Sequence, residues 1–345
     1  MTPDAPGQAP GQGPPAGFSW GDYVAWLVER QGSLAAVAER LAALSAYADD
    51  VGSVERGLRR LRARGQLGGG RWGAKALAAF GLPDALDERA RWMGAYHSRF
   101  TDLPLPLCQD LLRLWDRPPL SDSPSSVWLA LGHATCALRG DEREGAQAHL
   151  RRARASFGRA PPAARVELLL AEAFVASRVE RERVPALLAE AEPWLGLAMP
   201  ADDRACLHAR WVDQRAYELN HRRGGRPPDH AAAEALYAGI PTEGAPAFAL
   251  CRRASGLAFA HWKRGDVEGG AALAREACRH AGDGGHLRLR AMALTMLGRI
   301  VGGEEGAAAR ARAVAIAASL DDEALRLRFR AGRPGQRPDG PAGAC

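Results

Sequence analysis

The stretch that decides the fold is LAFAHWKRGDVEGGAALAREA, residues 257–277. Small and apolar residues recur at three- and four-residue spacing on both sides of Gly265-Asp266, which predicts two helices joined by a tight turn. The glycine suits a chain that must leave a helix through a left-handed conformation. Because one helical pair cannot bury its apolar face alone, this pair is expected to stack on neighbouring pairs.

Clusters of proline and glycine divide the rest of the chain at near-equal intervals. They recur about every 40 residues from residue 118 onward, and a period of this size is typical of stacked helical pairs. Each interval also has a smaller break near its middle, such as Arg139-Gly140-Asp141 or Gly302-Gly303. The pattern predicts helix–turn–helix units over about 125–320, arranged as a right-handed α-solenoid.

The composition favours an all-α protein. The chain has 345 residues, of which 47% are hydrophobic and 25% charged, as in ordinary globular proteins. Alanine, leucine, arginine and glutamate, which all propagate helices, dominate it. The β-branched residues Ile and Thr, in contrast, occur at few positions, namely Thr2, Thr101, Thr135, Ile240, Thr242, Thr295, Ile300 and Ile316. A sizeable sheet is therefore excluded.

Two of the units resemble a known repeat family. Residues 128–132 (WLALG) and 146–153 (AQAHLRRA) are similar to the two helices of a tetratricopeptide repeat, and residues 257–277 follow the same pattern without insertion. Leu297-Gly298 keeps part of it in the last unit, while the second and third units match in length and periodicity. About five tetratricopeptide-like hairpins are thus expected over residues 118–328.

The resemblance implies a concave groove, lined by the first helices, that binds a protein or peptide. Carried over to the fourth unit, the groove positions are Arg252, Ser255, Phe259 and Trp262. An arginine beside two aromatic rings suits recognition of an extended or helical peptide. Phe259 and Trp262 are equally compatible with a role as core residues that pack on the adjacent hairpin.

Residues 18–117 lack the period and are expected to form a separate helical module. Its third helix is predicted to begin near Ser53 and to stop at Gly65. Residues 54–75 include seven basic residues and a single acidic one, Glu55. The formal charge of the whole chain is only +6, so the positive charge is concentrated in this segment.

The order of helices in this module resembles a helix-turn-helix or winged-helix DNA-binding domain, with residues 53–65 (SVERGLRRLRARG) as its third helix. In such domains the third helix enters the major groove, and arginine pairs with both phosphates and guanine edges. The resemblance implies contacts from Ser53, Arg56, Arg59, Arg60 and Arg64. Two alternatives remain open: a solvated basic helix that caps the repeats, and a site for RNA or an acidic protein.

Two further helices are expected over 86–100 and 105–115. Trp92, Met93, Tyr96 and Phe100 recur at three- and four-residue spacing on the first of them, which predicts a buried aromatic face. His97 lies beside that face.

No enzyme signature accompanies these elements. The chain lacks a phosphate-binding GxxxxGK[ST] loop, HExxH and GxSxG, and Cys206 and His208 are too close on one helix to share a metal ion. No catalytic residue, metal or cofactor is therefore predicted. The scattered cysteines and the absence of a long apolar run favour a cytoplasmic protein without a membrane partner. Residues 1–17 and 329–345 are expected to be disordered tails.

These observations lead to two functional hypotheses. The first is a non-enzymatic, bacterial-type regulator whose basic module binds duplex DNA while its helical repeats bind a protein or peptide. The alternative is an interaction adaptor or scaffold that binds no nucleic acid, in which residues 18–117 only cap the repeats.

Overall fold

The protein is entirely helical in the part that the computed structural model describes, which is residues 17–44, 49–221 and 227–331. These ranges contain seventeen α-helices and three short 3-10 helices, and no strand. The prediction of an all-α protein is confirmed. The predicted tails lie outside the described residues, except for Gly17 and residues 329–331.

The chain divides into two compact units. Unit 1 consists of residues 1–90 and 111–126, and unit 2 consists of residues 91–110 and 127–345.

Unit 1 is built on four short helices. They are α1 (Trp20–Gln31), α2 (Leu34–Ala43), α3 (Val51–Arg62) and α4 (Gly70–Phe80). Polar side chains cap the first three: Ser19 and Asp22 form a capping box at α1, Ser33 caps α2, and Asp50 caps α3. Such caps satisfy backbone N–H groups that a helix start leaves unpaired.

The four helices share one core. Its largest member is the fully buried Trp20, whose indole N–H donates to the carbonyl of Leu67 at 2.8 Å. Val54, Leu58 and Leu61 of α3 pack into the same cluster. Residues 63–69 join α3 to α4 without a strand, so this part of the described chain has no β-wing.

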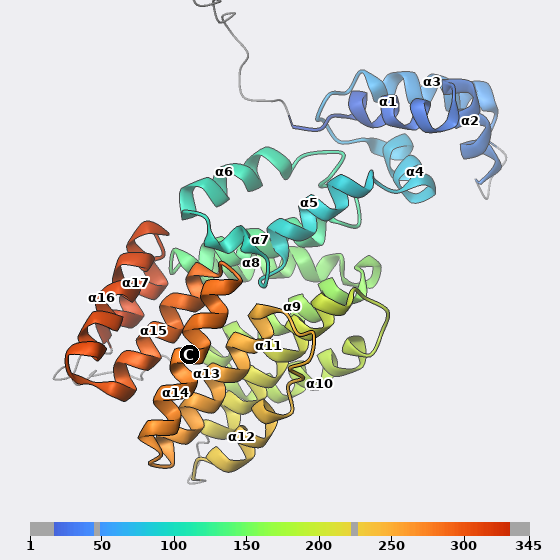
Figure 1. Cartoon of the computed structure of the whole chain (residues 1–345). Coiled ribbons are helices and arrows are strands. Elements are labelled where there is room, and N and C mark those ends of the chain that lie inside the picture. Colours follow the sequence, from blue (N-terminus) through green and yellow to red (C-terminus); the bar gives the residue numbers. More distant parts are fainter. Residues whose placement is uncertain (1–16, 45–48, 222–226, 332–345) are drawn as a thin grey trace, which may run out of the picture. The chain divides into compact units, whose positions relative to one another are not determined.

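Unit 2 is a series of helical pairs followed by one more helix (Figure 1). The helices are α7 (Ser126–Arg139), α8 (Arg143–Ala155), α9 (Pro162–Val179), α10 (Val184–Leu195), α11 (Ala201–Asn220), α12 (His230–Ala238), α13 (Ala247–Lys263), α14 (Val267–Asp283), α15 (Leu287–Val301), α16 (Gly303–Ser319) and α17 (Glu323–Ala331). The 3-10 helices η2 (Phe157–Arg159) and η3 (Arg181–Arg183) lie between α8 and α9 and between α9 and α10. The proline and glycine clusters of the sequence fall between these helices.

Successive pairs pack through their first helices. In chain order α9 contacts α11, α11 contacts α13, and α13 contacts α15, while the second helix of each of these pairs also touches the first helix of the next pair. The interface between α13, α14, α15 and α16 is rich in alanine, including Ala258, Ala274, Ala291 and Ala313. Small side chains let the helix axes approach closely.

Residues 91–110 differ from the expectation of a continuous helix over 86–100. Helix α5 (Asp84–Gly94) ends at Gly94, and a turn at residues 95–98 leads into η1 (Arg99–Asp102) and α6 (Leu105–Trp115). A Cβ on Gly94 would lie 2.2 Å from the carbonyl oxygen of Trp128, so α5 ends in backbone contact with α7. The hydroxyl of Ser98 donates to the carbonyl of Trp92 at 2.6 Å and stabilises the turn.

Candidate ligand-binding cavity

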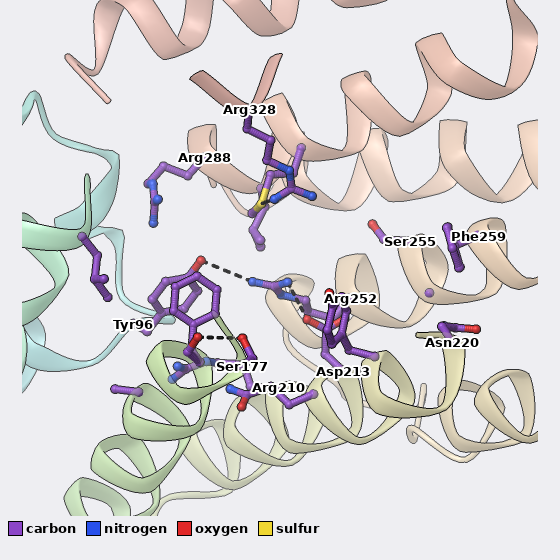
Figure 2. Close-up of a pocket in the computed structure, with 18 of the residues that line it drawn as sticks. Tyr96, Ser177, Arg210, Asp213, Asn220, Arg252, Ser255, Phe259, Arg288 and Arg328 are labelled. Carbon is purple, nitrogen blue, oxygen red and sulfur yellow. Dashed lines mark hydrogen bonds and ion pairs between the residues drawn. The ribbon is translucent and has the colours of Figure 1, made fainter. Parts of the chain in front are cut away.

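Unit 2 encloses a cavity of about 230 Å³ on the side of its first helices. Helices α7, α9, α11, α13, α15 and α17 all contribute to its lining, together with Tyr96 from the turn after α5. Figure 2 shows these side chains converging from the successive helices. The cavity is therefore formed jointly by the successive helical pairs and not by any one of them.

The lining of the cavity is rich in charged side chains. The lining contains five arginines and three carboxylates: Arg178, Arg210, Arg252, Arg288, Arg328, Glu167, Asp213 and Glu218. The guanidinium of Arg252 donates to Asp213 at 2.9 Å, and that of Arg210 pairs with Glu167. Arg288 donates from Nε to Asp322, which lies outside the lining, at 2.7 Å. The lining keeps an excess of positive charge.

Tyr96 lies at the centre of these arginines. Its ring centroid is 4.4 Å from Cζ of Arg210, 5.8 Å from that of Arg252 and 5.7 Å from that of Arg288. The Arg252 guanidinium also reaches the Tyr96 hydroxyl at 3.4 Å. The backbone N–H of Tyr96 donates to Glu167 at 3.3 Å. Cations over an aromatic face are attracted by the ring quadrupole.

The surroundings of Tyr96 change its acidity. Burial raises the pKa of its hydroxyl, but the charges of Arg288, Arg252 and Arg210 act in the opposite direction and leave that pKa below its ordinary value. A phenol whose anion is favoured in this way marks a region of positive potential.

Two polar atoms of the lining are buried without a hydrogen-bond partner among the described residues. They are Nε of Arg252 and Oε1 of Gln214, although the amide nitrogen of Gln214 donates to the Leu170 carbonyl at 2.9 Å. An unpaired buried donor or acceptor costs about 1–3 kcal/mol.

Apolar and aromatic side chains lie among these charges. Phe174, Phe259, Met292 and Met296 belong to the lining, and Arg178 and Arg328 contact Phe174 and Met292. The side chain of His221 stacks on Tyr217 with ring centroids 4.1 Å apart, and burial lowers the pKa of this histidine, so the neutral form is favoured.

A close approach of α12 to α13 completes the wall. A Cβ on Gly256 would lie 2.2 Å from the ring of Tyr237, so a larger residue has no room there. The Tyr237 hydroxyl in turn donates to Asp213 at 2.8 Å, which orients the carboxylate that holds Arg252.

The structure brings together three of the four predicted groove residues. Arg252, Ser255 and Phe259 line the cavity, as Figure 2 shows. Trp262, near the end of α13, lies outside the lining and packs in the alanine-rich cluster of α13 to α16. A side chain at this position faces α14, because the backbone of Trp262 lies against Gly270.

Several lining residues were missed by the sequence analysis. Arg210, Arg288 and Arg328 recur about 40 residues apart or at twice that interval, close to the repeat period, and that spacing was the available signal. Tyr96 had no such signal, since it lies outside the period and the continuous-helix prediction assigned it to a buried face.

The predicted DNA-contact residues lie together on α3 and in the turn after it. Arg56, Arg59, Arg60 and Arg64 are exposed, and Ser53 is half-buried. Arg59 pairs with Glu55 at 2.6 Å, and Arg56 donates to the Ser53 hydroxyl at 2.9 Å.

A buried arginine network in unit 2 shares Asp322 with the cavity residue Arg288. Arg139 is 1% exposed and donates to the carbonyls of Leu103 and Leu320 at 2.9 and 2.7 Å, to Asp322, and to Sγ of Cys108 at 3.3 Å.

Cys108 is acidified in this network. A hydrogen bond from the Cys136 thiol lowers its pKa, burial opposes that effect, and the charge of Arg139 contributes further, which gives a pKa of about 7.

No known protein family, curated protein or solved structure matches this chain. Within the described ranges, no group of three or more His, Cys, Asp or Glu residues is arranged to hold a metal ion. None of the helices in those ranges is long and apolar enough to cross a bilayer.

Proposed function

We propose that the chain is a ligand-responsive regulator: unit 2 is a tetratricopeptide-like solenoid that binds a ligand in its cavity, and unit 1 binds duplex DNA. One observation carries the ligand site, namely that the first helices of five successive pairs, together with α17, all contribute side chains to a single cavity. Such convergence is what a helical-repeat binding surface requires. The period of the sequence and the resemblance of residues 128–153 and 257–277 to tetratricopeptide repeats support the same assignment.

The composition of the cavity supports binding of a peptide end or of a molecule of similar size. The lining combines arginines that are paired with carboxylates and side chains that are aromatic or end in a thioether. Binding sites commonly combine an apolar body with a few polar groups that determine orientation.

The assignment of DNA binding to unit 1 rests on the two faces of α3. Val54, Leu58 and Leu61 anchor one face in the core, while Arg56 and Arg59 keep 64% and 67% of their side chains exposed on the other. A helix held in this way presents guanidinium groups to a partner without losing its packing. Arginine pairs with phosphates and with guanine edges, so duplex DNA is a suitable partner.

The DNA proposal is tested with the full-length protein and a fluorescent duplex over a series of salt concentrations. We expect binding at low salt, and a log–log salt dependence that becomes shallower by about 0.9 for each phosphate that a variant no longer neutralises. The double variant Arg59→Ala/Arg60→Ala should therefore weaken binding and reduce the slope by up to about 2.

The matched control is Arg275→Ala, which removes an exposed arginine of α14 that pairs with Glu305. It should leave DNA binding unchanged. If no duplex binds at low salt, or the control loses as much affinity as the double variant, the DNA assignment is wrong. The chain is then better described as an interaction adaptor. The ligand site of unit 2 is tested independently, by titration with candidate ligands.

A further inference from the structure

We infer that the cavity of unit 2 binds a small organic anion, with one carboxylate on an aromatic or branched apolar body. The carboxylate lies between the guanidinium groups of Arg252 and Arg288, beside the hydroxyl of Tyr96. The inference rests on the proposed ligand-binding function of unit 2 and names the class of its ligand.

The size of the ligand is limited by the segment that holds Tyr96. Residues 91–103 are attached to the first helices at several points: Arg91 and His97 both pair with Asp203 of α11, and Asp102 accepts from the backbone N–H of Arg288 at 2.9 Å. An extended peptide running along these helices would have to break those bonds. The space that remains is about 230 Å³, which suits a small molecule.

The charge of the ligand follows from the arginines. Arg252 donates to Asp213 through Nη1 and reaches the Tyr96 hydroxyl through Nη2. Arg288 donates to Asp322 through its Nε, which leaves its two terminal nitrogens for a ligand within the described part of the chain. Figure 2 shows the side chains of Arg252 and Arg288 ending on opposite sides of the Tyr96 hydroxyl. Guanidinium groups with free N–H donors bind a carboxylate with charge-assisted hydrogen bonds.

The body of the ligand follows from the apolar side chains of the lining, which include Phe259, Met292 and Met296. Thioether sulfurs make favourable contacts with aromatic rings and adapt to irregular shapes. An aromatic or branched apolar group attached to the carboxylate therefore packs against these side chains.

Tyr96 provides an internal reporter of the anion. Protonated, its hydroxyl can donate to the carboxylate, whereas the tyrosinate would repel it and compete for the same guanidinium groups. The titratable and charged groups around Tyr96 include Arg210 of α11, Arg252 of α13, Arg288 of α15, Glu167 of α9 and Asp322 before α17. Asp102 and His286 line a small cavity beside Tyr96. Affinity for the anion should fall as the pH rises and Tyr96 ionises, and bound anion should raise the pH at which Tyr96 ionises.

The experiment is calorimetric titration of the full-length protein with phenylacetate, indole-3-acetate, 4-methylpentanoate and octanoate, each beside its neutral amide. At least one acid should bind tenfold or more tightly than its amide at pH 7. Arg288→Gln should weaken that acid at least tenfold, while Arg290→Gln, an exposed arginine of the same helix, should leave its affinity unchanged.

A second measurement does not depend on the stability of Arg288→Gln. The tyrosinate absorbance near 295 nm is followed against pH with and without the acid. The tyrosine that ionises at the lowest pH should ionise at a higher pH when the acid is bound. Tyr96→Phe, which keeps the ring, should remove both that ionisation and the pH dependence of binding.

If no acid binds better than its amide, or the Tyr96 transition does not respond to a bound acid, the inference is wrong. Binding of apolar peptides that is weakened by Phe259→Ala, with no binding of the acids, would overturn the inference but keep the proposed ligand site. Binding of neither class would overturn both, and would leave the DNA assignment of unit 1 to its own experiment.

Discussion

The arginines of α3 and those of the unit 2 cavity have the same side chain, but the former are exposed to solvent and the latter are largely buried. Arg56 and Arg59 keep 64% and 67% of their side chains in solvent, whereas Arg210, Arg252 and Arg288 keep 8%, 15% and 12%. Exposed guanidinium groups stay hydrated, so they cost little folding free energy, and salt screens their interactions with other charges. Buried ones must be paired with carboxylates, carbonyls or rings, because a lone buried charge is very costly.

The comparison teaches that arginine content alone does not locate a site in this protein. All but Lys75 and Lys263 of its 46 basic residues are arginine. What distinguishes the proposed surface for a polyanion from the proposed pocket for a single anion is the burial and pairing of each side chain. Three experiments test how far that distinction holds.

The largest effect is expected for Arg139→Met. This substitution leaves the carbonyls of Leu103 and Leu320 without their buried donor and removes one partner of Asp322. Breaking a buried ionic network costs about 3–5 kcal/mol. Urea denaturation followed by circular dichroism should show a loss of that size.

The matched exposed substitution is Arg60→Ala on α3, which should change the free energy of unfolding by less than about 0.5 kcal/mol. Equal losses in the two variants would contradict the distinction between buried and exposed arginines.

An intermediate effect is expected for Tyr96→Phe, and it depends on pH. The pKa of Tyr96 is lowered in the folded protein, so between that value and the unfolded value near 10 the unfolded chain binds more protons and stability rises with pH. In this pH range the free energy of unfolding of the wild type should rise, relative to that of the variant, by up to about 1.4 kcal/mol per pH unit. Paired urea titrations at pH 7 and at successively higher pH measure it, and a difference that is constant with pH would show that the guanidinium groups do not act on the hydroxyl.

The smallest effect is expected for Glu55→Ala on the exposed face of α3. It breaks the pair with Arg59 at 2.6 Å, and exposed pairs four residues apart on a helix contribute about 0.3–0.5 kcal/mol. Thermal unfolding in low salt should show a slight loss that vanishes in 1 M salt. DNA binding, in contrast, should strengthen slightly, because a negative charge leaves the proposed interface.

Much of the fold was predictable because it follows from local rules. Gly265 and Gly302 mark turns between paired helices, and the alternation of breakers about every 40 residues matches the observed helix ends. The helix predicted over 86–100 is present as far as Gly94, and its predicted end was wrong. Gly94 lies against the backbone of Trp128 where α5 ends, and no periodicity within residues 86–100 reports that contact.

The candidate cavity was predictable only in part. Arg252, Ser255 and Phe259 were found because they occupy one face of one helix, a relation that the spacing of three and four residues encodes. Trp262 has the same spacing but faces a neighbouring helix, because the packing of α13 on α14 and α15 decides which part of its surface is covered.

The sequence by itself determined the helical class, the position of most turns and the basic character of α3, since helix propensity, breakers and charge depend on neighbouring residues. The tertiary structure alone decided that Tyr96 meets Arg210, Arg252 and Arg288, residues more than one hundred positions away in the chain. The physical reason is that burial and electrostatic pairing depend on proximity in space, which the stacking of the helical pairs creates and no local pattern contains.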